Sequence, residues 1–184
     1  MPSNAPYGFR PHRHLAGGVI RNDEYPIATG YATALCTGDP VKLAADGTIE
    51  LAAAGDRILG IFQGVSYTAS DGSQVFTSRW AASTAATNVK ASVITDPNVT
   101  YEVQSAGTPA QTNVGNLADH VTGTGSTYTG QSAAVLSATM GTGVAGFRVL
   151  RIVDKPGNSG IYASLEVHIL EHEFVEFSQA TPGV

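Results

Sequence analysis

The residue types best suited to chemistry occur together in one run near the C-terminal end, Glu166–Glu173, which reads EVHILEHE. Histidine and carboxylate side chains are metal ligands, and on a strand alternate residues share a face and can converge on one ion. His168 and His172 are four residues apart, so on a strand they are separated by about 13 Å, with Leu170 between them. The run also lacks the His-Glu-x-x-His order of zinc proteases. We therefore favour a solvated or interface strand and keep a β-barrel metalloenzyme as the weaker alternative.

Other catalytic templates are missing from the sequence. We find no Gly-x-Ser-x-Gly elbow, no phosphate-binding P-loop and no dinucleotide fingerprint. The glycine-rich stretch 123–130 has no strand-to-helix context, and Cys36, the only cysteine, has no neighbouring histidine or lysine to lower its pKa. A carboxylate pair for glycoside hydrolysis stays open, since no pair of acids stands out. We expect no catalytic residue, no metal and no cofactor, and hence a protein that is not an enzyme.

The composition favours association with other proteins over binding to nucleic acid or membrane. Charged residues make up 14% of the 184 residues, against about 25% in an average soluble domain. Small side chains lose little entropy on ordering, which suits packing against a partner, although a β protein with many turns has the same composition. The net charge of −5 argues against nucleic acid. We find no apolar run of about 18 residues and no signal-peptide pattern, so we expect assembly in a cytosol.

Residues 1–26 are predicted to form an extended arm. Prolines at three of the first eleven positions disfavour a helix, and the segment is locally basic. Aromatic residues supply much of the contact area at interfaces. We therefore predict that Tyr7, Phe9, Arg10 and Arg13 contact a neighbouring subunit, either of a larger assembly or of another copy of the chain, the alternative being a disordered or draped terminus. Deleting residues 1–20 is expected to leave a folded body that attaches less well.

The remaining residues, 27–184, are predicted to form a single β-rich domain. Short apolar or alternating runs are separated by turn signals such as Gly38-Asp39-Pro40. The expected strands are 31–37, 41–43, 48–51, 57–67, 89–95, 99–104, 146–154 and 161–170. Residues 81–90 are the best helix candidate, and a long Gly/Ser/Thr-rich loop is expected at about 105–133, with a helical turn near Leu117. The predicted fold class is mainly β, an antiparallel barrel or jelly-roll-like sandwich with an extended N-terminal arm.

Alternation in 147–153 predicts which side chains share a face. Phe147, Val149, Arg151 and Val153 should point one way, and the residues between them the other way. The turn signal at 155–160 then predicts an antiparallel pair with 161–170. Most of this pair is expected to build the core.

Three stretches resemble small decoration or cement proteins of tailed-bacteriophage capsids. The first runs from Gly38-Asp39-Pro40-Val41 to Arg57-Ile58-Leu59-Gly60-Ile61-Phe62, and the others are 147–158 and 165–174. The resemblance implies a β-barrel or jelly-roll-like body, often a homotrimer, that sits at capsid symmetry axes and clamps major capsid protein subunits. These are turn-and-strand patterns, and the family offers no fixed motif from which individual binding residues could be assigned.

The expected function is therefore that of a structural virion protein on the outer surface of the capsid. Its partners would be the major capsid protein and copies of itself, with no nucleic acid and no membrane. Many weak contacts repeated by symmetry add up to strong attachment. The alternatives are another virion component, such as a tail, head-fibre or minor capsid protein, and a glycan-binding β module that uses Trp80 and the loop at 105–133.

Overall fold

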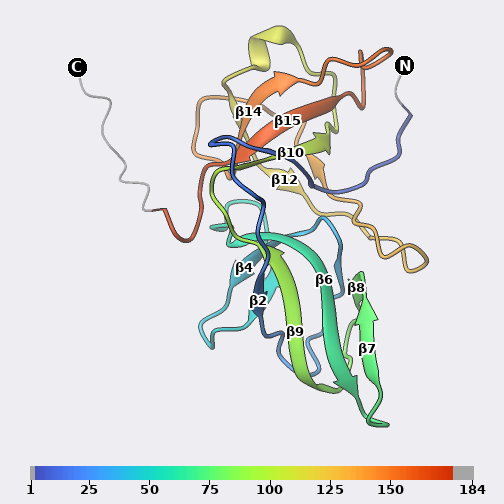
Figure 1. The fold of residues 1–184 in the computed structure, drawn as a ribbon. Helices are drawn as coiled ribbons and strands as arrows, with labels where there is room; N and C mark the ends of the chain where they lie inside the picture. Colours follow the sequence, from blue (N-terminus) through green and yellow to red (C-terminus); the bar gives the residue numbers. More distant parts are fainter. Residues whose placement is uncertain (1–2, 176–184) are drawn as a thin grey trace.

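The computed structural model describes residues 3–175 and shows a mainly β protein with antiparallel sheets, which confirms the predicted fold class. Within these residues no sheet closes into a barrel, and the arrangement is consistent with a β sandwich. Two sheets dominate, one in the upper and one in the lower half of Figure 1. No helix of the described residues is long and apolar enough to cross a membrane.

The upper sheet contains the first and last strands, and we call it the terminal sheet. Its strands are, in spatial order, β1 (Arg10–His14), β10 (Val99–Gln104), β15 (Ser164–Ile169), β14 (Phe147–Ile152) and β11 (Leu117–Ala118). All four pairings are antiparallel. Strands from opposite ends of the chain are therefore neighbours, and the N-terminal segment is an integral edge of this sheet.

The lower sheet, here the central sheet, is built from the middle of the chain. Its strands are β2 (Asp23–Tyr25), β9 (Ala86–Ile94), β6 (Gly60–Ala69), β4 (Pro40–Leu43) and β5 (Ile49–Leu51), with β7 (Gln74–Thr77) also paired to β6. Two small pairs complete the structure: β3 (Leu35–Cys36) with β8 (Arg79–Trp80), and β12 (His120–Val121) with β13 (Val135–Leu136). The one described helical element is a 3₁₀ turn, η1 (Gln111–Asn113).

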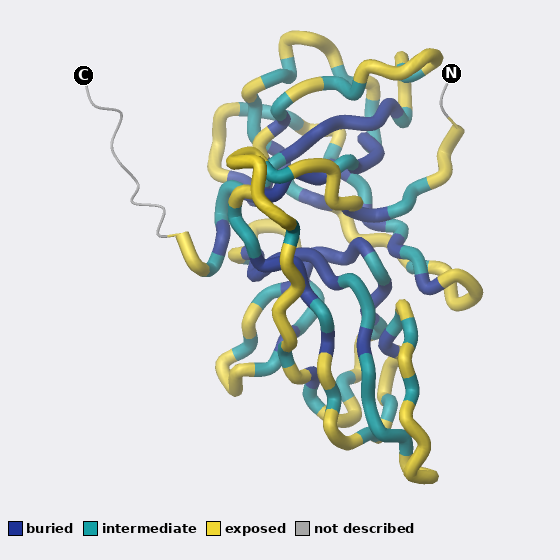
Figure 2. The backbone as a smooth tube through the Cα atoms, viewed as in Figure 1, coloured by how far each residue is buried: buried dark blue, intermediate teal, exposed yellow. Residues whose placement is uncertain are grey.

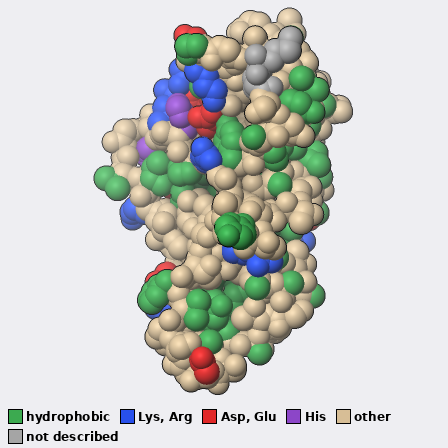
Figure 3. All heavy atoms as spheres, turned by 90° about the vertical axis from the view of Figure 1, so that its right-hand side faces the viewer, with side chains coloured by type: hydrophobic (Ala, Val, Ile, Leu, Met, Phe, Trp, Pro, Cys, Tyr) green, Lys and Arg blue, Asp and Glu red, His purple; other side chains and the backbone are tan. Residues whose placement is uncertain are grey.

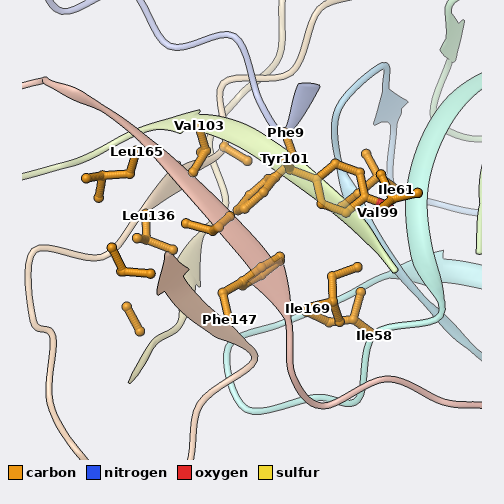
Figure 4. Close-up of a cluster of buried hydrophobic side chains, with 14 of the residues drawn as sticks. Phe9, Ile58, Ile61, Val99, Tyr101, Val103, Leu136, Phe147, Leu165 and Ile169 are labelled. Carbon is orange, nitrogen blue, oxygen red and sulfur yellow. The ribbon is translucent and has the colours of Figure 1, made fainter. Parts of the chain in front are cut away.

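Each sheet has its own cluster of buried apolar side chains. Buried residues, dark blue in Figure 2, accordingly occur along the chain in both halves of the molecule. Under the terminal sheet, the ring of Phe9 is stacked on that of Phe147, with centroids 4.4 Å apart (Figure 4). Trp80 lies in the other cluster and is fully buried. Full burial of such large side chains is worth roughly 1.5–3 kcal/mol each, so both clusters contribute substantially to folding.

Strands β6 and β9 connect the two clusters. On β6, Ile61 belongs to the cluster of the terminal sheet, and the next residue, Phe62, belongs to that of the central sheet. Successive residues of a strand point to opposite sides, so one strand supplies both clusters. At the crossing, β6 approaches β9 so closely that a Cβ on Gly60 would lie 2.0 Å from the carbonyl oxygen of Ile94. Only glycine fits at that position.

The extended N-terminal arm is not confirmed. Residues 10–14 pair with β10, and residues 23–25 pair with β9, so the segment lies along both sheets of its own chain. The main-chain N–H of Phe9 also donates to the carbonyl of Gly38 at 2.9 Å. Proline excludes helix but permits an edge strand, where a missing N–H can face outward.

The best helix candidate of the sequence, residues 81–90, does not form a helix, because β9 begins at Ala86 and continues to Ile94. The Ser and Thr residues that make this segment a poor helix are compatible with the strand that the sheet requires. The stretch 105–133 contains β11, β12 and η1, and is therefore more structured than a single long loop. Its helical turn lies at 111–113, and Leu117 is in a strand.

A bulge in β14 changes the predicted alternation. Val149 pairs with Val167, but Arg151 pairs with Glu166, so one extra residue is accommodated between them. Phe147 and Val149 face the core as predicted, whereas Arg151 is shifted to the solvent side. The bulge thereby adds a cation to the outer face of the terminal sheet.

Candidate functional site

The outer face of the terminal sheet carries rows of polar side chains that run across the strands. In one row, the pairing aligns Arg10, Glu102, Glu166 and Arg151 from four successive strands. A second row aligns residues 13, 100, 168 and 148 in the same strand order. We call this surface, with the neighbouring Tyr7, His12 and Lys155, the charged face.

Glu166 is the centre of the charged face. Its side chain is fully buried, while those of Arg13 and Arg151 are about half exposed at 50% and 52%. Arg13 donates to Glu166 Oε1 at 2.6 Å, and Arg151 donates to Oε2. Burial alone would raise the pKa of the Glu166 carboxyl, but the hydrogen bonds from its partners outweigh burial and hold that pKa below its ordinary value. The carboxylate therefore stays ionised and fixes two guanidinium groups whose outer edges face solvent.

Glu102 organises the other end of the same row. It accepts hydrogen bonds from the hydroxyl of Tyr7 at 2.9 Å and from the ammonium of Lys155 at 2.7 Å. The guanidinium of Arg10 lies 4.3 Å from the centre of the Tyr7 ring, a cation–π contact. Burial is the main reason that the pKa of the Tyr7 hydroxyl is raised, so this group stays protonated and remains a donor.

The charged face concentrates the scarce charge of the chain. It holds five of the ten Lys and Arg residues, at positions 10, 13, 148, 151 and 155, against the two carboxylates described above. In Figure 3, charged and histidine side chains gather at the upper left, over the half that contains the terminal sheet. The protein as a whole is acidic, with a net charge of −5. One locally basic surface on an acidic, charge-poor protein suits recognition of an acidic partner surface.

Three of the four predicted contact residues meet on this face, and the fourth does not. Tyr7, Arg10 and Arg13 lie on it, whereas Phe9 is fully buried in the cluster of the terminal sheet. Phe9 is not accessible to a partner in this structure. Its side chain packs in the core, so the predicted contact at Phe9 is wrong. Sequence reasoning missed Glu166 as the organising residue, because a buried glutamate leaves no local signal in the sequence.

The histidines of the metalloenzyme alternative are both engaged with the main chain. His168 Nε2 lies 2.5 Å from the carbonyl oxygen of Pro97. His172 Nδ1 accepts a hydrogen bond from the N–H of Phe174 at 3.1 Å. Burial lowers the pKa of both rings, which keeps them neutral. Among residues 3–175, no group of three or more His, Cys, Asp or Glu side chains is placed to hold a metal ion.

The residues suspected for glycan binding differ in accessibility. Trp80 is fully buried, with Tyr67 packed edge-on against its ring at 5.5 Å between centroids, so its ring is not available to stack on a sugar. Tyr128, in the predicted loop, is fully exposed. Cys36 is also buried, and its thiol has a raised pKa chiefly because of that burial. A raised pKa makes a thiolate nucleophile unfavourable there.

Comparisons with known proteins found no match, whether against models of protein families, curated proteins or solved structures.

Proposed function

We propose that this chain is a structural protein of a tailed-phage virion that attaches to the outer surface of the capsid through its charged face. Its partner would be the major capsid protein, and attachment would stabilise the shell by bridging neighbouring subunits. The observation that carries the proposal is the charged face itself, where the arginines around Glu166 are held in place with their outer edges in solvent.

The arrangement of this face supports binding more than catalysis. Arg13 and Arg151 are already ordered by Glu166, so little side-chain entropy is lost when they meet a partner carboxylate. Each guanidinium retains N–H donors that can form paired hydrogen bonds with such a group. The face of a five-stranded sheet, in turn, allows contact over a wide area.

Repetition would supply the strength of attachment. We propose a homotrimer at a symmetry axis, in which each copy makes a modest contact with the shell. When several contacts form together, overall attachment can exceed that of one contact by about 10²–10⁴-fold. The few charged side chains are concentrated on the charged face, and small side chains are common on the rest of the protein. This distribution would favour binding to the shell over binding to non-specific partners.

The test is co-sedimentation with capsids stripped of this protein, comparing two double variants of equal charge change. Arg10→Glu with Arg148→Glu alters exposed positions of the charged face, whereas Lys42→Glu with Lys90→Glu alters the central sheet. We expect the first variant to lose attachment at least tenfold and the second to bind like the wild type. Raising the salt concentration from about 0.1 to 0.5 M should weaken wild-type attachment, because the Debye length shortens. Equal occupancy of the two variants would overturn the proposed surface.

A further inference from the structure

A cavity of about 370 Å³ lies between the β3–β8 pair and the glycine-rich stretch 123–130. We call it the Arg79 pocket, and none of the residues that line it belongs to the charged face. Its polar lining includes Arg79, Asp39 and four threonines, at positions 33, 122, 124 and 127. The volume is near the lower end of the range for small-molecule sites, about 300–1,000 Å³.

The pairing of β3 with β8 directs Arg79 toward this cavity. Leu35 is paired with Trp80, and both side chains are buried in the cluster of the central sheet. The next pair, Cys36 and Arg79, therefore points to the opposite side, where the two side chains are neighbours. The glycine-rich stretch covers this side closely, since a Cβ on Gly125 would collide with the sulfur of Cys36. Glycine at this position therefore lets the stretch form a wall of the pocket.

Arg79 is the arginine of this chain that is most withdrawn from solvent. Six of the seven arginines are exposed, and Arg79 is the one that is partly buried. It forms no salt bridge with the carboxylates of residues 3–175. Burial and the nearby Asp39 raise the pKa of the Cys36 thiol, and the guanidinium of Arg79 opposes them, which places this cation beside the thiol in the pocket. A cation that is partly removed from water and has no counter-ion gains from an anionic partner.

The charges of the lining favour an anion with a single negative charge. Among the described residues that line the pocket, Arg79 is the only cation and Asp39 the only acid. Asp39 Oδ2 accepts a hydrogen bond from the N–H of Cys36 at 2.7 Å, and its Oδ1 accepts one from the hydroxyl of Ser132. The Asp39 carboxyl is thus held by groups of the fold, but it would still repel a ligand with two negative charges. A carboxylate carries one charge, and its two oxygens match the paired donors of a guanidinium.

We propose that the Arg79 pocket binds a carboxylate group carried on a short carbon chain. The guanidinium of Arg79 would form paired hydrogen bonds with the carboxylate, and the threonine hydroxyls of the lining would donate further ones. Ala34 and Leu51, which also line the pocket, would contact the carbon chain. This inference is independent of the proposed capsid attachment, because it concerns the isolated chain and a surface outside the charged face.

Titrations of the isolated protein, followed by NMR shifts of its backbone amides, test this site at pH 7 and constant ionic strength. The probes are butyrate and benzoate, their neutral counterparts butyramide and benzamide, inorganic phosphate, and a blocked tripeptide that ends in alanine as the free acid or as the amide. We expect the acids to shift the amide signals of Arg79, Thr124 and Gly125 until saturation, with a Kd in the millimolar range, and the neutral amides to cause no such shifts.

The same titrations identify the source of the carboxylate. Tighter binding of the tripeptide acid than of butyrate would point to the C-terminal end of a peptide, and weaker binding would point to a free organic acid. Equal shifts from acids and amides, or no saturable shift at all, would refute the proposal. Phosphate that binds more tightly than every carboxylate would overturn the assignment of a singly charged ligand.

Variants at Arg79 localise the binding. Arg79→Gln removes the charge and should raise the Kd for butyrate at least tenfold, because the paired, charge-assisted hydrogen bonds are lost. Arg21→Gln makes the same charge change at an exposed residue outside the pocket and should leave the Kd unchanged. Far-UV circular dichroism and Trp80 fluorescence verify that each variant is folded.

A second substitution covers the case in which Arg79→Gln does not fold. Arg79→Lys keeps the charge but loses the paired donors, and it should weaken butyrate binding at least threefold. If neither variant folds, the position of the wild-type amide shifts decides, since saturable shifts outside the pocket would refute the site. Unchanged affinity in a folded Arg79 variant would refute the assignment as well.

Discussion

A single buried carboxylate determines how the cations of the charged face are presented. Glu166 is fully buried and accepts from Arg13 and Arg151, which remain about half exposed. If the carboxylate were absent, both guanidinium groups would rotate freely in solvent and would lose more entropy on binding. Glu166 therefore acts on any partner through the two arginines that it positions.

Replacing Glu166 with glutamine should lower the free energy of unfolding by about 1–3 kcal/mol, because a neutral amide of the same shape is left facing two cations. The exposed halves of the arginines keep the loss below that of a fully buried pair. Urea denaturation measures the change. Glu24→Gln is the matched control, since Glu24 and Lys90 form a largely exposed pair, and such pairs contribute little to stability. Similar losses in both variants would contradict the central role of Glu166.

Three histidines make stability depend on pH. Burial lowers the pKa of His120, His168 and His172 in the folded protein, while the unfolded chain takes up protons near the ordinary value of about 6.5. Stability is therefore complete above that value and decreases as the pH falls below it. We expect the urea midpoint to be lower at pH 5.5 than at pH 7.5. Burial is the main reason that the pKa values of Asp39 and Glu171 are raised, so protonation of these carboxyls at low pH increases stability. The comparison is therefore made above pH 5, where the histidines dominate the change. A midpoint that is constant or rises on acidification would disprove this.

At the scale of elements, β1 belongs to the body of the protein. Phe9, just before it, is fully buried and stacked on Phe147. The deletion of residues 1–20 that the sequence suggested as a binding test would therefore also remove an edge strand and part of the core. Point changes on the charged face separate binding from folding more cleanly.

Phe9→Ala should lower the free energy of unfolding by about 3–5 kcal/mol, the usual cost of a cavity the size of a phenyl ring. Thermal or urea unfolding provides the measurement. Tyr128→Ala is the aromatic control, because that side chain is fully exposed and its loss should change stability by less than about 0.5 kcal/mol. If Phe9→Ala were as stable as the control, the N-terminal segment would lie outside the core in solution.

Strands with a clear sequence pattern were predictable, and elements that depend on distant partners were not. Residues 99–104 form a strand as predicted because alternation and the Asp96-Pro97-Asn98 turn define both its period and its start. The two-residue strand β8 is too short for a period, and β3, which lies within the predicted strand 31–37, is limited to the two residues that pair with β8. Bulges also depend on a distant partner. The extra residue beside Arg151 is apparent only from the pairing of β14 with β15.

The candidate site was predictable only in part. Basic and aromatic residues near the N-terminus suggested a contact surface, and Tyr7, Arg10 and Arg13 do lie together. The other half of the surface comes from residues 87 or more positions away along the chain, which only the sheet pairing brings near.

At the scale of the whole molecule, the two sheets should unfold together. Ile58, Ile61 and Ile94 come from the central part of the chain but belong to the cluster of the terminal sheet. A cavity in one cluster therefore weakens contacts that position strands of the other. Trp80, the only tryptophan, reports on the central sheet alone.

Ile169→Ala, a cavity in the terminal sheet, should lower stability by about 2–5 kcal/mol. We expect the urea midpoint from Trp80 fluorescence to decrease as much as the midpoint from far-UV circular dichroism, because the unfolding is one cooperative transition. A Trp80 midpoint that stays at the wild-type value would show that the sheets unfold independently. The exposed Val19→Ala, at 83% exposure, serves as the neutral control.

The alternation of inward and outward residues in the terminal sheet has an evolutionary consequence. Exposed outward residues such as Arg10 and Arg148 can be exchanged one at a time without disturbing the buried residues beside them, since each strand separates the two sets. New specificities for a partner surface could therefore arise by stepwise mutation of Arg10 or Arg148 at little cost to folding. The same sheet would then serve as an adaptable scaffold, on which recognition evolves while the architecture is conserved.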